Sequence, residues 1–268
     1  MWLPAPLLIA GPCVLEHDTL NLRIAELVAE VGTRLGLRVV FKGSFDKANR
    51  ARRAAPRGPG LEAGLAMLAR VRDEIGIPVL TDVHDPAQVP AVAAVADALQ
   101  VPAFLCRQTD LVEAVARAGR PMNVKKGQWM APEEMAGPVG KARAAGATTV
   151  AVTERGTAFG YGDLVVDMRA FARLRDATGA AVLFDATHSV QRPGRGPAGT
   201  SGGDRSMVPV LLRAAAAAGA DGFYIETHPT PDTAPSDAAS MWPLGELPQL
   251  VESALDVWHA GQGGRVRA

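Results

Sequence analysis

The stretch Phe41-Lys-Gly-Ser-Phe-Asp-Lys-Ala-Asn-Arg50 begins as an apolar strand and ends in charged and amide side chains. Lysine is rare in this chain, with five lysines against twenty-three arginines, and four of the five lie in this stretch or at Lys125 and Lys126. Compact ammonium groups that follow apolar runs indicate an anionic ligand such as phosphate. The alternative is that they are ordinary solvated loop lysines.

The same succession of an apolar run and polar residues recurs along the chain. Eight runs are predicted as strands: Leu7–Cys13, Val39–Phe45, Val79–His84, Ala98–Phe104, Met122–Gly127, Thr148–Gly156, Ala181–Ser189 and Gly222–Pro229. They are continuously apolar rather than alternating, which is typical of parallel strands covered on both faces.

Amphipathic or alanine-rich segments between the strands predict helices, among them Asp18–Leu35, Leu61–Ile75, Pro86–Ala96, Glu133–Ala145, Asp204–Ala218 and Leu244–Ala260. Eight strand–helix units in 268 residues have the size and pattern of a (β/α)8 TIM barrel, an α/β fold that here forms a single domain over residues 1–268. A doubly wound open sheet is the alternative, but its usual glycine fingerprint after an early strand is missing from the sequence. The segment 190–203, rich in Gly, Pro and Arg, is predicted as a mobile loop of this domain.

The composition limits the classes of partner. Lysine plus arginine and aspartate plus glutamate both total 28, and the resulting net charge of zero argues against nucleic acid. The apolar run Leu7–Cys13 is too short to span a membrane and follows no basic residue, so we predict a first strand and no membrane partner. With two cysteines in the whole chain a disulfide framework is not expected, and the predicted location is the cytoplasm.

Polar residues cluster at the carboxyl ends of the predicted strands. In a barrel these ends converge on one mouth, where enzymes of this fold place their chemistry. The cations among them are Lys42, Lys47, Arg50, Arg107, Lys125 and Arg155. Several cations at one mouth suit ligands that carry phosphate and carboxylate groups.

A possible metal-binding set is Cys13, His188, Glu226 and Asp237. One thiolate, one imidazole and two carboxylates suit a divalent transition metal. The four residues are scattered along the chain, so Cys13 can equally be a small buried hydrophobe, and His188 a hydrogen-bonded core histidine. For His84 and His228, three roles are left open: metal ligand, residue that supports the site, and ordinary residue at a strand end.

Over about residues 8 to 250 the sequence resembles the 3-deoxy-D-manno-octulosonate 8-phosphate synthase family. The motifs that carry this resemblance are Ile9-Ala-Gly-Pro-Cys13, Phe41–Arg50, Arg57-Gly-Pro-Gly60, Thr81-Asp-Val-His84, Pro102–Asp110, Asn123-Val-Lys-Lys-Gly-Gln128, Thr153-Glu-Arg-Gly156, Phe159-Gly-Tyr161, Phe184–Ser189, Ser201-Gly-Gly203 and Glu226-Thr-His-Pro229. The element Lys47-Ala-Asn-Arg50 is specific, because the sister family that makes the seven-carbon shikimate precursor carries a Lys-Pro-Arg-Thr-type element there.

The resemblance implies a reaction. Phosphoenolpyruvate, D-arabinose 5-phosphate and water give 3-deoxy-D-manno-octulosonate 8-phosphate and inorganic phosphate, and the product enters the inner core of lipopolysaccharide. By analogy, C3 of phosphoenolpyruvate attacks the aldehyde, water adds at C2, and carbon–oxygen cleavage releases phosphate from the hemiketal. The resemblance also implies a homotetramer.

The roles of the family's residues carry over by position. Lys125 and Arg155 are implied to hold the phosphate and carboxylate of phosphoenolpyruvate. Lys42, Ser44 and Gln100 are implied to lie near it.

On the sugar side, Lys47 is implied to polarise or protonate the aldehyde oxygen. Asn49 and Asp237 are implied to bind hydroxyls of the arabinose chain. Arg50 is implied to grip its terminal phosphate. Asp82 is implied to support the site, and Arg107 is implied to come from a neighbouring subunit.

The residue at position 13 separates two branches of the family, because metal-independent members carry Asn where this chain has Cys13. The resemblance therefore implies a metal-dependent enzyme with Cys13, His188, Glu226 and Asp237 as ligands. One divalent transition metal per subunit is expected, namely Fe²⁺, Zn²⁺, Mn²⁺ or Co²⁺, since thiolate and imidazole disfavour Mg²⁺ and Ca²⁺. Whether this ion activates water or orients the aldehyde is left open. The expected catalytic residues are Lys47, Asn49, Lys125, His188 and Asp237.

One position departs from the family pattern. Ala51 stands where the family usually has Ser, so a hydroxyl expected at the arabinose phosphate is missing. Three other interpretations remain: the seven-carbon synthase, which uses erythrose 4-phosphate, a sialic-acid-type synthase, and a non-catalytic sugar-phosphate or metal sensor. The element around Asn49 argues against the first, and turnover would separate an enzyme from a sensor.

Overall fold

The computed structural model describes residues 6–50, 52–159, 162–196 and 201–263. Within these residues, eight parallel strands form a barrel: β1 (Leu7–Gly11), β2 (Arg38–Lys42), β3 (Val79–Asp82), β4 (Ala98–Val101), β5 (Met122–Lys125), β6 (Val150–Glu154), β9 (Ala181–Asp185) and β12 (Gly222–His228). Each strand pairs with the next one along the chain, and β12 pairs with β1. The (β/α)8 barrel is therefore confirmed, and the open doubly wound sheet is excluded.

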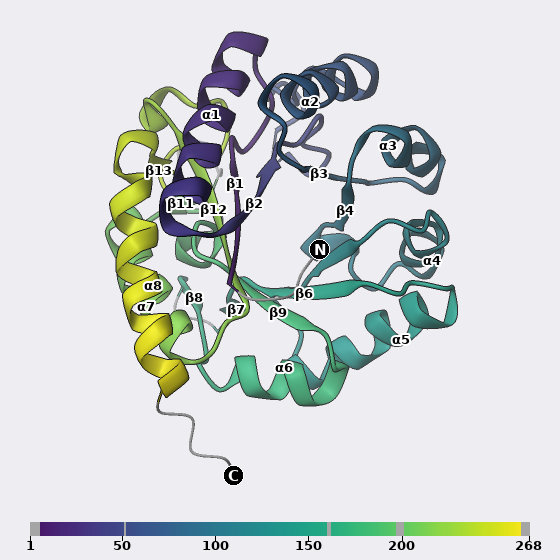
Figure 1. The fold of residues 1–268 in the computed structure, drawn as a ribbon. Coiled ribbons are helices and arrows are strands. Elements are labelled where there is room, and N and C mark those ends of the chain that lie inside the picture. Colours follow the sequence, from purple (N-terminus) through teal and green to yellow (C-terminus); the bar gives the residue numbers. More distant parts are fainter. Residues whose placement is uncertain (1–5, 51, 160–161, 197–200, 264–268) are drawn as a thin grey trace.

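The helices form an outer ring around these strands (Figure 1). In the described part of the chain they are α1 (Asp18–Leu35), α2 (Leu61–Ile75), α3 (Val89–Val95), α4 (Thr109–Arg117), α5 (Ala136–Ala144), α6 (Ala170–Thr178), α7 (Val208–Ala217) and α8 (Leu247–Gly263). The six helices predicted by range are confirmed, and α4 and α6 complete the ring. None of the described helices is both long and apolar enough to cross a membrane.

Local sequence signals set the ends of the helices. The imidazole of His17 caps α1 by accepting the N–H of Leu20 at 3.3 Å. Gly36 ends α1 with φ 64°, and Gly76 ends α2 with φ 75°. Glycine adopts this left-handed conformation at little steric cost, so both helices end at these glycines.

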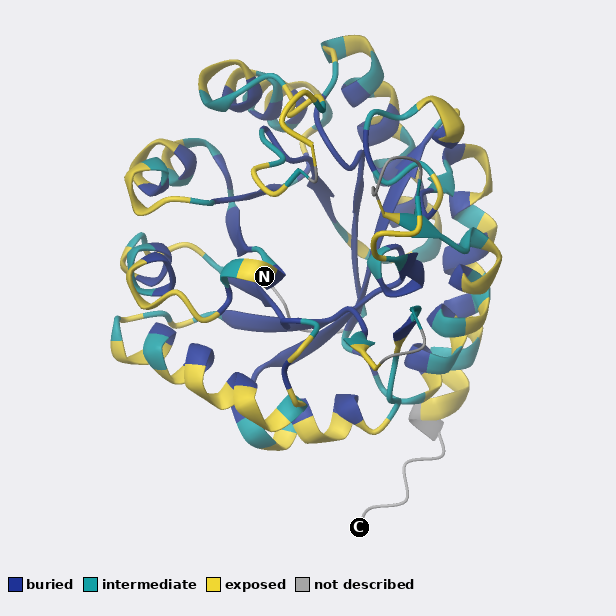
Figure 2. Cartoon of the chain, turned by 180° about the vertical axis from the view of Figure 1, so that it is seen from behind, coloured by how far each residue is buried: buried dark blue, intermediate teal, exposed yellow. Residues whose placement is uncertain are grey.

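The hydrophobic core has two parts. Successive side chains of a strand point to opposite faces, so Leu8 and Ala10 pack against the helices, whereas Leu7 and Ile9 point into the barrel. The barrel interior is filled by Leu7, Ile9, Val40, Leu80, Ala98, Ala151, Ala181, Leu183 and Tyr224. Figure 2 shows the buried strands and the inward faces of the helices in dark blue, with the exposed outer faces in yellow. The polar residues at the carboxyl ends of the strands thus lie above an apolar barrel interior.

Short strands occur in the loops after the main strands. They are β7 (Thr157–Ala158), β8 (Leu164–Val165), β10 (Gln191–Arg192), β11 (Gly202–Gly203) and β13 (Trp242–Pro243). The segment predicted as a mobile loop contains an antiparallel pair, in which Gln191 lies opposite Gly203. Residues 197–200 lie outside the described part, and the mobility of the segment stays a prediction.

Candidate active site

A cavity of about 660 Å³ opens at the carboxyl ends of the barrel strands. The predicted site residues that line it are Lys42, Lys47, Asn49, Arg50, Asp82, Gln100, Lys125, Arg155, His188, Glu226 and Asp237. Ser44 and Cys13 are buried beside the lining residue Lys42. Arg107 is exposed and is not among the described residues that line this cavity.

The wall formed by β1 and β2 is closely packed. A Cβ atom on Gly11 would lie 2.0 Å from the carbonyl oxygen of Lys42, so the two backbones approach in a way that only glycine permits. Lys42 Nζ donates to Ser44 Oγ at 2.7 Å and to Glu226 Oε1 at 3.1 Å. Burial opposes a charge on Lys42, but Asp82 and Glu226 outweigh it and raise the pKa of this ammonium group.

A belt of buried hydrogen bonds runs from β2 to β6. Ser44 Oγ donates to Asp82 Oδ2 at 2.8 Å, and Gln100 Nε2 donates to Asp82 Oδ1 at 2.8 Å. Asn123 Nδ2 donates to Gln100 Oε1 at 2.9 Å, and Thr153 Oγ1 donates to Asn123 Oδ1 at 2.7 Å. The predicted residues Ser44, Asp82 and Gln100 thus form one network, whose members fix each other's orientation.

Lys125 and His188 share the carboxylate of Asp185. Lys125 Nζ forms an ion pair with Asp185 Oδ2, and His188 Nδ1 lies 2.7 Å from the same oxygen. An imidazole bonded to a carboxylate through Nδ1 carries its proton there, which leaves Nε2 free as a ligand. Burial lowers the pKa of Lys125, while Asp185 counteracts this effect.

Arg155 follows β6, which lies between β5 and β9 in the barrel. Its Nη2 donates to Gln191 Oε1 at 2.6 Å, and Gln191 Nε2 donates to Asp237 Oδ1 at 2.6 Å. Among the described residues, no group accepts a hydrogen bond from the buried Nη1 of Arg155. A buried guanidinium with an unused donor is suited to an anion that enters the cavity.

The proposed metal ligands lie together although they are far apart in sequence. Ligand atoms of Cys13, Glu226 and Asp237 lie within 4.8 Å of one another. His188 Nε2 lies 3.5 Å from Glu226 Oε2 and 3.8 Å from Asp237 Oδ2. Within the described residues, Glu226 Oε2 is buried without a hydrogen-bond partner. A thiol, an imidazole and two carboxylates, one with an unused oxygen, fit a divalent transition metal.

Two other features mark the same cluster. Asp237 has φ 52° and is the only non-glycine residue with positive φ in the part of the chain that the structure describes. Such backbone strain is concentrated at functional sites. Burial, followed by the carboxylates of Asp237 and Glu226, raises the pKa of the Cys13 thiol well above its usual value. The thiol donates to Asp237 Oδ2 at 2.9 Å, so a cation would have to displace that proton.

The sugar side of the cavity is formed by residues 47–50 and the loop that contains Asp237. Lys47 Nζ lies 4.0 Å from Glu226 Oε1, and Asn49 is exposed on the rim. Arg50 Nη1 donates to Ser236 Oγ at 2.7 Å. Ala51 lies outside the described residues, so the expected effect of its missing hydroxyl stays a prediction.

Gln191 and Tyr224 are two of the lining residues that were not predicted as site residues from the sequence. Tyr224 precedes Glu226 by two residues on one strand, so the period of two would have placed both on the inner face. Gln191 follows the predicted strand end, and no local signal distinguishes it.

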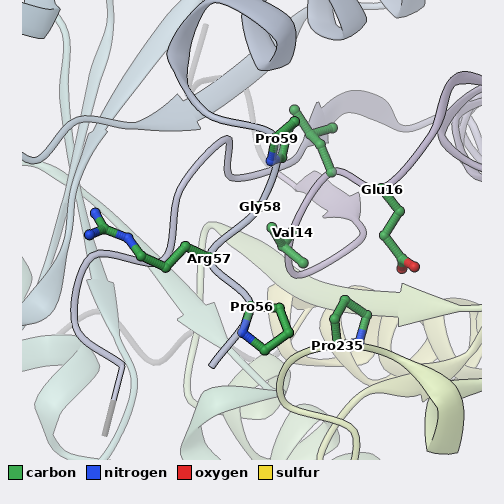
Figure 3. A pocket seen from close by; sticks show the side chains of 8 residues that line it. Val14, Glu16, Pro56, Arg57, Gly58, Pro59 and Pro235 are labelled. Atoms are coloured by element: carbon green, nitrogen blue, oxygen red, sulfur yellow. The ribbon is translucent and has the colours of Figure 1, made fainter. Parts of the chain in front are cut away.

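The two unassigned histidines lie near this region. His84 lines the cavity. His228 Nε2 lies 3.2 Å from Glu16 Oε1. A second pocket of about 380 Å³ lies beside Glu16 and is bordered by Pro56, Pro59 and Pro235 (Figure 3).

The sequence was compared with protein families and with curated proteins. The model of the DAHP synthetase I family matches residues 4–259. A 2-dehydro-3-deoxyphosphooctonate aldolase of Alkalilimnicola ehrlichii is 54% identical over 250 residues, covering 93% of this chain and 90% of the relative. Proteins of the same name from Rhodopseudomonas palustris and Acidithiobacillus ferrooxidans are 53% and 51% identical, covering 92% and 94% of this chain and 86% and 89% of the relatives. The chain therefore belongs to the DAHP synthetase I family, and within it to the group of 2-dehydro-3-deoxyphosphooctonate aldolases, also called 3-deoxy-D-manno-octulosonate 8-phosphate synthases.

Proposed function

We propose that this protein condenses phosphoenolpyruvate with D-arabinose 5-phosphate and water, giving 3-deoxy-D-manno-octulosonate 8-phosphate and inorganic phosphate for lipopolysaccharide synthesis. The observation that carries this proposal is the buried pair Lys125 and Arg155 at one cavity, where Arg155 Nη1 has no partner among the described residues. Two fixed cations in a water-poor site are suited to an acid phosphate such as phosphoenolpyruvate. The names of relatives more than 50% identical support the same reaction.

The cavity can hold the two substrates side by side. Lys125 and Arg155 would bind the phosphate and carboxylate of phosphoenolpyruvate, above the belt that contains Gln100. Arg50 lies toward the loop of Ser236 and would bind the far phosphate of the sugar. Asn49 and Asp237 would bind hydroxyls between these ends. This order brings C3 of one substrate to the aldehyde of the other.

Lys47 is placed to supply the proton that this step requires. Burial opposes its charge, but the nearby carboxylates of Glu226 and Asp82 favour it and the pKa of Lys47 is raised, so the side chain is an ammonium at neutral pH. As C3 of phosphoenolpyruvate bonds to the aldehyde carbon, the aldehyde oxygen takes a proton from Lys47. Water then bonds to C2 and loses a proton, which returns Lys47 to its ammonium form. The C2–O bond breaks as the C2 hydroxyl becomes a ketone, and the proton of that hydroxyl leaves with the inorganic phosphate. Lys125 and Arg155 stabilise the leaving charge.

We also propose that the protein belongs to the metal-dependent branch. Cys13, His188, Glu226 and Asp237 would hold one Fe²⁺, Zn²⁺, Mn²⁺ or Co²⁺ ion. Two observations support this set of ligands: Oε2 of Glu226 has no hydrogen-bond partner among the described residues, and the contact of His188 Nδ1 with Asp185 leaves Nε2 available as a ligand. When bound, such an ion supplies a Lewis acid. The protein is further proposed to act in the cytoplasm as a homotetramer.

Phosphate release tests this function. We expect turnover of phosphoenolpyruvate with arabinose 5-phosphate and not with erythrose 4-phosphate, loss of turnover after EDTA, and recovery with Mn²⁺ or Co²⁺. Turnover with erythrose 4-phosphate alone would contradict the sugar assignment. Turnover in metal-free enzyme, verified by elemental analysis, would contradict the metal assignment and leave the reaction intact. No turnover with either sugar would favour a sensor.

A further inference from the structure

Tyr224 is a side chain of the cavity floor for which the reaction scheme above has no task. It lies on β12, where it pairs with Ile9 of β1 and is level with Asp185 of β9. Its side chain is 1% exposed and lines the cavity below Glu226. A tyrosine at this depth offers two groups, a phenol hydroxyl and an aromatic face.

The aromatic face is occupied by an ammonium group. Lys125 Nζ lies 3.5 Å from the centroid of the Tyr224 ring, and its ion-pair partner is Asp185. At this distance the negative face of an aromatic ring attracts a cation, and the attraction is stronger in a desolvated site. The hydroxyl lies 3.4 Å from Glu226 Oε1, longer than a usual O–H···O hydrogen bond.

A ring and a carboxylate stabilise an ammonium in different ways. Asp185 forms an ion pair with Lys125, and its own negative charge repels an approaching phosphate. The ring of Tyr224 carries no net charge, so it stabilises the ammonium without repelling an anion. Burial works against the charged form of Lys125, and this makes an uncharged stabiliser useful at this position.

We infer that Tyr224 is a positioning residue whose aromatic face keeps the ammonium of Lys125 in place for the phosphate of phosphoenolpyruvate. This inference rests on the proposed role of Lys125 as a phosphate ligand. It assigns a specific electrostatic task to the ring, which differs from the packing task of any large side chain.

A graded replacement of the ring separates these two tasks. Tyr224→Phe keeps the ring, and introducing phenylalanines with one, two and three fluorine atoms at position 224 weakens its negative face at nearly constant shape. We expect Tyr224→Phe to keep the KM for phosphoenolpyruvate within about twofold, because the ring remains. We expect the KM to rise stepwise with fluorination, and Tyr224→Leu to raise it about threefold to thirtyfold. The KM for arabinose 5-phosphate should change by less than about twofold, because Lys125 does not serve the sugar.

Two variants complete the design. Phe184→Leu removes a buried aromatic of β9 that packs on Phe171 of α6, with ring centroids 5.9 Å apart, and should leave the KM for phosphoenolpyruvate unchanged. Lys125→Met measures the effect of the ammonium itself. An unchanged KM across the fluorinated series, with a raised KM in Lys125→Met, would overturn the inference and keep the phosphate site. An unchanged KM in Lys125→Met would overturn both.

Discussion

The orientation of the His188 imidazole depends on the carboxylate of Asp185. Asp185 holds Nδ1 at 2.7 Å, so Nε2 faces Glu226 and Asp237. We expect His188→Ala to lower the affinity for Mn²⁺ on the order of a hundredfold or more, because even a partner behind a ligand contributes about tenfold to a hundredfold. Phosphate release should fall with it. Metal titration of the EDTA-treated protein measures the affinity without reference to activity.

His259 provides the matched control for this variant. It is exposed on α8, far along the chain from the cavity residues. His259→Ala should keep both the metal affinity and the rate of phosphate release. Full metal occupancy in His188→Ala, with a normal circular dichroism spectrum, would show that His188 is not a ligand.

At the scale of the strands, a buried ion pair joins the end of β5 to the end of β6, next to Lys125 and Arg155 in the chain. Lys126 Nζ lies 3.6 Å from Glu154 Oε1 and donates to Thr157 Oγ1 at 3.0 Å. Glu154 Oε1 in turn accepts the backbone N–H groups of Arg155 and Gly156 at 2.9 and 2.6 Å. The pair therefore fixes the turn from which Arg155 extends into the cavity.

Breaking this pair should cost stability. Lys126 is fully buried, so Lys126→Met leaves the carboxylate of Glu154 uncompensated. We expect a loss of about 3–5 kcal/mol in the free energy of unfolding, measured with urea. The double variant Lys126→Met/Glu154→Gln should recover at least half of this loss, because no charge remains unpaired.

Lys141→Met is the control for this prediction. It removes exposed hydrogen bonds to Arg107 and Thr109 and should cost about 1 kcal/mol or less. Equal losses in the single and double variants would refute the role of the charge.

The strands could be predicted because their signal is local. A parallel strand such as Val150–Glu154 is buried along its whole length, so its composition alone identifies it. The polar strand ends could be assigned to one mouth because the barrel brings them together. The link from Arg155 through Gln191 to Asp237 could not be predicted, since Gln191 and Asp237 are 46 residues apart and meet only through loop packing. The two-residue strands β10 and β11 depend on tertiary contacts in the same way.

For the whole molecule, burying so many charges makes stability depend on pH. Burial opposes the charge of Asp82, but Lys42 and Lys47 outweigh it and lower its pKa well below the usual value of 3.8. A pKa that is lower in the folded state stabilises the fold above the unfolded value, and this contribution is lost as the pH falls. We expect the urea midpoint to drop steeply below about pH 4. Asp82→Asn should be less stable at pH 7 and show a shallower drop.

An exposed aspartate separates this effect from general acid sensitivity. Asp256 is exposed on α8, and Asp256→Asn should keep the steep profile of the parent protein. Parallel profiles for the parent and Asp82→Asn would mean that Asp82 does not supply the pH-dependent stability.

In the proposed homotetramer, a neighbouring subunit would complete the cavity. Phe104, which lines the cavity, and Trp129 are 54% and 50% exposed, and their ring centroids lie 5.9 Å apart. Arg107 follows Phe104 by three residues and is not among the described lining residues of its own cavity. A neighbouring subunit that covers these rings would bury apolar surface and could bring its Arg107 to the site.

Mixing two impaired variants tests this arrangement. Arg107→Ala keeps an intact cavity but cannot supply the cation to a neighbour, whereas Lys125→Met has a damaged cavity and an intact Arg107. We expect each variant alone to release phosphate slowly and a mixture, unfolded and refolded together, to regain activity, because an Arg107→Ala cavity can receive Arg107 from a Lys125→Met subunit. Sedimentation should show tetramers in every sample. Tetramers that gain nothing on mixing would place Arg107 outside the shared site, and monomers would refute the assembly itself.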